Sequence, residues 1–173
     1  MIRKVLIPAL FVGSMLALPA AADDDTLAKF KGGIGVIGVS SGVGAAATAE
    51  VVNRNIVRGV QPAGQIWVID KLEAEVAIGG RIKVKGKGLI LGGGNNAGRA
   101  AGQFVFATLI CEAAAPFTEL NTNLVGVPLA PNGDFEIDDA LTPRPSACPS
   151  PMLLIRNAAG LAWFAVGIVD FSN

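Results

Sequence analysis

The chain has 173 residues, of which 51% are hydrophobic and 16% charged, and its 14 Lys and Arg residues balance its 14 Asp and Glu residues. This length corresponds to one domain. Balanced charge argues against nucleic-acid binding, because nucleic-acid-binding proteins normally carry a basic excess. The chain has no histidine and no tyrosine, which leaves few side chains for acid–base catalysis. We therefore expect a protein that is not an enzyme and holds no cofactor.

Residues 1–22 have the three parts of a secretory signal peptide. Two basic residues precede an apolar run (Val5–Leu18), and small residues lead to the expected cleavage site after Ala22. The apolar run is only about 14 residues long, whereas a membrane-spanning helix needs roughly 20. We expect a single domain over residues 23–173 that is secreted or periplasmic and, after cleavage, has no transmembrane segment.

The glycine-rich stretch after Lys31 contains two motif look-alikes. Gly-x-Gly-x-x-Gly, at Gly33, Gly35 and Gly38, marks nucleotide sites only between a strand and a helix, and a polar segment precedes it here. Gly-x-Ser-x-Gly, at Gly38, Ser40 and Gly42, needs a histidine to accept the serine proton. We interpret both as parts of a glycine-rich strand. Residues 45–58 leave helix and strand open, with a strand favoured over 51–58.

The clearest alternation of apolar and charged residues runs over 71–91, on both sides of Ile78-Gly79-Gly80. A two-residue loop would mix the two faces, whereas a three-residue loop keeps the apolar residues together. Gly80 supplies the left-handed residue that such a loop needs. The sequence therefore predicts a hairpin whose charged face is solvated and neutralised by neighbouring residues. The predicted register pairs Ala77 with Arg81, Glu75 with Lys83, and Glu73 with Lys85.

A second strong signal is the strand expected over 103–111, after a glycine-rich loop. It is apolar on both faces, so it is either buried on both sides or lies against a partner subunit. It ends at Cys111, and Cys148 lies in a proline-rich loop over 142–151. Two cysteines in an exported chain predict a disulfide, because exported proteins meet an oxidising compartment. A C-terminal hairpin is expected from 152–156 and 161–170.

Acidic residues alternate along the strand expected over 134–138. Carboxylate oxygens are the ligands that calcium prefers, so this segment is a candidate calcium site. Residues on one face of a strand are, however, usually its solvated face, and the spacing of an EF-hand is absent. The candidate ligands are Asp134, Glu136, Asp138 and Asp139.

Together these elements predict an all-β fold, a β-sandwich or small barrel of about eight to ten short antiparallel strands with one disulfide. A membrane β-barrel is the main alternative, but it would carry aromatic girdles at both interfaces. Aromatic residues make up only 6% of this chain.

Four segments resemble a group of secreted bacterial proteins that have no assigned activity: residues 55–64, 86–98, 102–111 and 131–139. The resemblance implies a secreted β-rich globular domain and no particular chemistry. We therefore expect a structural or interaction protein of the cell envelope or extracellular space. It could self-associate or bind an envelope partner. The alternative is a secreted binding module for an apolar ligand or a calcium ion.

Overall fold

The computed structural model describes residues 26–43 and 50–172, and all the regular structure in these residues is β. The expected signal peptide and its cleavage site lie outside the described residues, as do residues 44–49 of the ambiguous stretch. The strands are β1 (Thr26–Gly35), β2 (Val39–Val43), β3 (Glu50–Arg54), β4 (Trp67–Val68), β5 (Lys71–Ala77), β6 (Arg81–Lys87), β7 (Ile90–Leu91), β8 (Phe104–Ile110), β9 (Leu120–Asn121), β10 (Val127–Pro128), β11 (Phe135–Ala140), β12 (Met152–Asn157) and β13 (Trp163–Val169).

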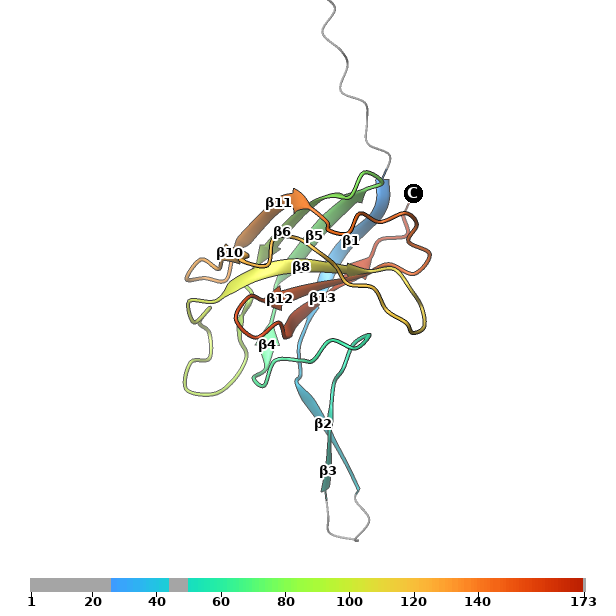
Figure 1. Ribbon diagram of the computed structural model, residues 1–173. Helices are drawn as coiled ribbons and strands as arrows, with labels where there is room; N and C mark the ends of the chain where they lie inside the picture. The colour runs from blue at the N-terminus through green and yellow to red at the C-terminus, as the bar shows by residue number, and fades with distance from the viewer. Residues whose placement is uncertain (1–25, 44–49, 173) are drawn as a thin grey trace, which may run out of the picture.

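The main sheet is a nearly closed antiparallel barrel with the strand order β10-β8-β12-β13-β1-β5-β6-β11, and β9 also pairs with β8 (Figure 1). The strands at the two ends of this order, β10 and β11, are joined by a tight turn in which the Ala130 amide donates to the Asp134 carbonyl at 2.9 Å. The expected all-β fold with one disulfide is confirmed, and it takes the form of a barrel. Side chains such as Leu72, Val84 and Leu153 are fully buried in its core.

The hairpin β5–β6 has the predicted register. Glu75 lies opposite Lys83 and Glu73 opposite Lys85, and apolar side chains on both strands are buried while the charged ones are exposed. Gly80 has a φ of 84°, and its amide donates to the Ala77 carbonyl at 2.8 Å. The three-residue loop is therefore confirmed, because alternation and turn chemistry both specified it.

The second half of this hairpin is shorter than predicted. β6 ends at Lys87 because Gly88 adopts a φ of 65°, which turns the chain out of the strand. Ile90–Leu91 then forms β7, which pairs with β4 in a separate two-stranded sheet. Trp67 of β4 is buried, as expected, and stacks on Phe164 with ring centroids 4.0 Å apart.

The doubly apolar strand at 103–111 is buried within its own chain. β8 lies between β12 on one side and β9 and β10 on the other, and all of its residues after Phe104 are buried. Of the two interpretations of this strand, burial on both sides within the chain is therefore the one that the structure supports, and no partner subunit is needed to cover it. At its end, Cys111 is bonded to Cys148 with the Cα atoms 4.4 Å apart, which confirms the predicted disulfide.

Candidate interaction surface

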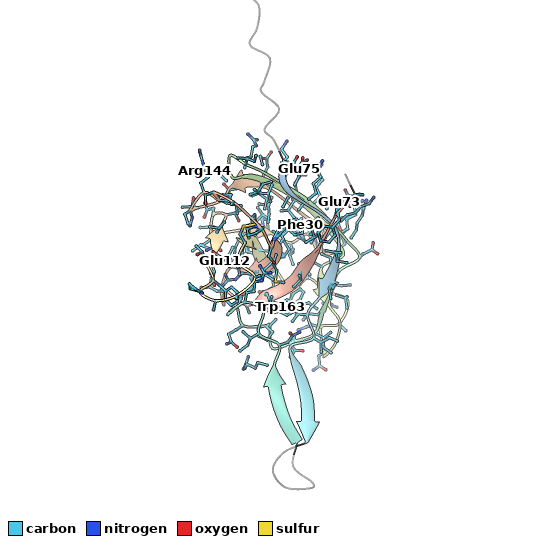
Figure 2. The ribbon with its side chains drawn as sticks, turned by 90° about the vertical axis from the view of Figure 1, so that its right-hand side faces the viewer. Phe30, Glu73, Glu75, Glu112, Arg144 and Trp163 are labelled. Atoms are coloured by element: carbon cyan, nitrogen blue, oxygen red, sulfur yellow. A yellow bond between two sulfur atoms is a disulfide. The ribbon has the colours of Figure 1, made fainter. Side chains whose placement is uncertain are left out.

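The strands β2 and β3 form a hairpin, here named the arm, that extends away from one end of the barrel (Figures 1 and 2). The two strands pair antiparallel, with Val39 opposite Arg54 and Val43 opposite Glu50. Within residues 26–43 and 50–172, neither outer edge of the arm is paired with another strand. The arm thus presents two free edges, and free edges are templates for pairing with another chain.

The base of the arm is held firmly by the barrel. The Val36 amide donates to the Phe164 carbonyl at 2.9 Å, and the Trp163 indole Nε1 donates to the Asn55 carbonyl at 3.0 Å. The Asn55 side chain in turn donates from Nδ2 to the Ile37 carbonyl at 3.2 Å. Both chain segments that lead into the arm are therefore fixed, so the direction in which it extends is set by the barrel.

Two glycines of the look-alike motifs, Gly35 and Gly38, belong to this base. A side-chain carbon at Gly35 would overlap the Trp67 carbonyl oxygen, and one at Gly38 would overlap the Ala63 carbonyl oxygen. These glycines are required because another part of the backbone passes close by. Ser40 and Gly42 lie in β2, and the sequence holds no histidine that could activate the serine.

The arm also has an unusual sequence. From Gly32 to Ala49, between Lys31 and Glu50, no residue carries a charge. Next to the arm's base, Ile37 is 64% exposed and Ile56 is 49% exposed. Sequence reasoning missed this surface because glycine, serine and valine without charges gave no clear period, although the length of the uncharged stretch was visible.

A second surface, the charged face, covers the outside of β1, β5, β6 and β11. Basic strands alternate with acidic ones there, and two of the four basic residues of β6, Arg81 and Lys85, form ion pairs with β11. The ion pairs are not those across the β5–β6 hairpin, because β1, β11 and β5 itself supply closer partners. They join Lys29 to Glu75 (3.8 Å), Lys71 to Glu73 (2.8 Å), Arg81 to Asp138 (3.0 Å) and Lys85 to Glu136 (3.5 Å).

One carboxylate on the charged face is electrostatically perturbed. A hydrogen bond from Lys71 and the charge of that lysine hold the pKa of the Glu73 carboxyl below its usual value. Glu73 lines a shallow depression, together with Phe30 and neighbouring lysines of β1 and β6. Because most of its lining consists of charged side chains, several of them in exposed ion pairs, the depression has the properties of solvated surface.

The four candidate calcium ligands do not converge. Glu136 pairs with Lys85 and Asp138 with Arg81. Asp134 accepts a hydrogen bond from the Gly88 amide at 3.1 Å, and Asp139 accepts one from the Asn123 amide at 2.8 Å. Among the residues that the structure describes, no three metal-ligating side chains lie together.

A third surface, the apolar depression, lies where β8 begins. Phe104 and Leu124 are about half exposed and Val125 is 73% exposed, and the three line one shallow depression with small residues of the β12–β13 turn. Sequence reasoning missed it because Leu124 and Val125 belong to a connecting segment distant from Phe104 in the sequence.

A buried arginine on β12 was not predictable from the local sequence. The Arg156 side chain is 6% exposed, and its Nη1 lies 2.6 Å from the Glu119 carboxylate. Its Nε donates to the Leu161 carbonyl at 2.8 Å, and its guanidinium lies 5.3 Å from the centre of the Phe106 ring. Because every polar group of this cluster has a partner inside the chain, the cluster is structural.

Comparison with known proteins adds no family to these observations: neither a family model, a curated protein nor a solved structure matches the chain. In the part of the chain that the structure describes, no helix is long and apolar enough to cross a membrane.

Proposed function

We propose that the protein is a non-catalytic structural or interaction protein of the cell envelope or extracellular space, and that the arm is its contact element. The arm carries the proposal because it is a hairpin with two unpaired edges in the described residues, an uncharged first strand and a fixed base. A disulfide is compatible with export, since disulfides persist in oxidising compartments. The low supply of acid–base side chains favours binding over catalysis.

The proposal can be tested by removing the arm without disturbing its base. A two-residue Asn-Gly turn can join Gly38 directly to Asn55, since the Asn55 amide already donates to the Gly38 carbonyl at 3.2 Å. We expect this arm-shortened variant to be exported and folded but to lose the cross-linked complexes that the full chain forms in the cells that export it.

The matched control alters another apolar surface. A Phe104→Ser variant changes the apolar depression, which contains no residue of the arm, and should keep the cross-linked complexes. If the arm-shortened variant kept the same complexes as the full chain, the arm would not be the contact element and the proposal would fail.

The apolar depression supports a second candidate function, the binding of an apolar ligand. Phe104, Leu124 and Val125 expose apolar surface in one place, which often marks a binding site. Native mass spectrometry of the protein purified from its own source tests this function. A mass above that of the bare oxidised chain, lost in the Phe104→Ser variant, supports it, and a bare mass contradicts a tightly held ligand.

A further inference from the structure

We infer that β3 pairs with β3 of a second copy of this chain, antiparallel, about a two-fold axis at Val52. The inference rests on the proposed function, because it takes the arm as the contact element and names its partner. It follows from the hydrogen-bond pattern of the arm, from the charges on its strand and from the marginal stability of a two-stranded sheet.

The hydrogen-bond pattern determines which residues face the free edge of β3. In an antiparallel pair, opposite residues alternate between bonded and non-bonded pairs. The Asn55 amide donates to the Gly38 carbonyl, and these two residues continue the register of the arm, so they form a bonded pair. Alternation then makes Ser40–Asn53 and Gly42–Val51 the bonded pairs. The backbone groups of Glu50, Val52 and Arg54 consequently point away from β2, toward the free edge. Of these groups, the Arg54 carbonyl already accepts a hydrogen bond from the Ile56 amide at 2.9 Å.

One two-fold register uses all of the outward groups that have no partner within the chain. With Val52 opposite Val52 of the second copy, Glu50 lies opposite Arg54 of the second copy, and Arg54 lies opposite Glu50 of the second copy. Val52 then forms a bonded pair across the axis, and each Arg54 amide can donate to the Glu50 carbonyl of the other copy. A shift in either direction leaves outward backbone groups of β3 without a partner, so this register is the best one available to the backbone.

The charges select the same register. Its two outer pairs each join an acidic residue to a basic one, and opposite charges directly across two strands stabilise the pairing. The antiparallel direction also puts the two barrels at opposite ends of the resulting ribbon. The free edge of β2 offers less, because Val39–Val43 contains two serines and a glycine, which are poor strand formers, and no charge.

The low stability of an isolated hairpin also favours pairing of the arm with the arm of a second copy. A two-stranded hairpin alone is marginally stable, whereas three or more strands support one another. Pairing of two arms gives a four-stranded ribbon, β2-β3-β3-β2. The exposed Ile37 and Ile56 at its ends extend the apolar surface available to the second copy. Because the contact is small, we expect dissociation in the micromolar range, weaker at high salt.

Charge exchange between Glu50 and Arg54 tests the inference with the exported, disulfide-bonded protein. In Glu50→Arg, two arginines face each other at both ends of the contact, and in Arg54→Glu two acidic residues do so. Each variant alone should dimerise at least about tenfold more weakly than the wild type, because both outer pairs change sign. An equimolar mixture of the two variants should recover the wild-type affinity, since every outer pair is then again acidic with basic.

Sedimentation equilibrium at low ionic strength measures these affinities. Recovery in the mixture cannot come from damage to folding, so it supports the intermolecular pairing of residues 50 and 54. A wild-type protein that stays monomeric throughout the micromolar range would overturn the inference. It would not decide the proposed function, which is tested separately by cross-linking with the arm-shortened variant. Wild-type dimers that both variants form equally well would also overturn it, because another surface would then join the copies.

Discussion

The barrel and the arm are both built from short antiparallel strands, but different interactions hold them. In the barrel, β5 and β6 bury one face, and β8 and β12 bury nearly all of both faces. The arm consists of two five-residue strands that pair only with each other in the described residues. The barrel's strands are therefore stabilised by burial within the chain, whereas the arm depends on its own ladder and its base.

Because of this difference, we expect the barrel to determine the stability of the fold and the arm to determine association. A strand whose faces and edges are covered by its own chain contributes to folding and has little surface left for a partner. A strand with a free edge contributes little to folding but can still form hydrogen bonds with another chain. Changes in the barrel should therefore alter the free energy of unfolding, and changes in the arm should alter association.

Reduction of the Cys111–Cys148 disulfide should have the largest effect on the barrel. The bridge spans 37 residues, so the chain-entropy model predicts a loss of about 4 kcal/mol in the free energy of unfolding. Thermal unfolding with and without reductant, with thiol release confirmed, measures the effect as a lower melting temperature. An unchanged melting temperature with both thiols free would show that the core alone maintains the barrel.

Replacement of the buried arginine should have the next largest effect. Arg156→Met removes charge-assisted hydrogen bonds to Glu119 and to the Leu161 carbonyl, and we expect a loss of about 2 kcal/mol in urea unfolding. Glu119→Gln is the matched control. Its effect should be clearly smaller, because the oxygen of the glutamine side chain can still accept the hydrogen bond from Arg156 Nη1. Equal losses in both variants would contradict this explanation.

These cases show what local sequence could predict. The β5–β6 register was predictable because alternation and Gly80 act within one short segment. The disulfide was predictable because a chain that is expected to be exported and has two cysteines offers a single pairing. The ion pairs of β6 were not, because Glu136 and Asp138 approach β6 through the pairing of β11, which is distant in the sequence.

The buried arginine and the arm were hidden for related reasons. Arg156 ends an apolar run, and its burial depends on Glu119 and Phe106, which other segments bring to it. The arm lacks the alternation of polar and apolar residues that marks a strand with one buried face. The sequence favoured strands on both sides of the arm, but it carried no signal that they pair only with each other.

Protonation of Glu73 on the charged face in acid should change the free energy of unfolding by less than the two changes above. The pKa of the Glu73 carboxyl is lowered by Lys71 in the folded protein, so the ionised form favours folding. This contribution is present above the unfolded-state pKa of about 4.3 and is lost as the pH falls through the lower folded-state value. Glu73→Gln should therefore destabilise the barrel slightly at neutral pH and not at all in strong acid, in urea unfolding at both pH values. A constant difference at both would contradict the assignment, and in a Lys71→Gln background the pH dependence should vanish.

Hydrogen exchange of the arm's amides should report the smallest free energies of opening. The pattern of protection along β3 should be the most specific test of its pairing. Amides of β8 and β12 should exchange only through global unfolding, at rates independent of protein concentration, because these strands lie deep in the barrel. In dilute protein, β3 amides should exchange far faster, since β2 and β3 pair only with each other in the described residues. At higher concentration the amides of Glu50, Val52 and Arg54 should gain protection, whereas those of Val51 and Asn53, which already face β2, should change less. Residue-resolved NMR exchange at two concentrations measures this alternation. Uniform protection along β3, or none that depends on concentration, would contradict pairing at its free edge and leave the arm as a contact for a different partner.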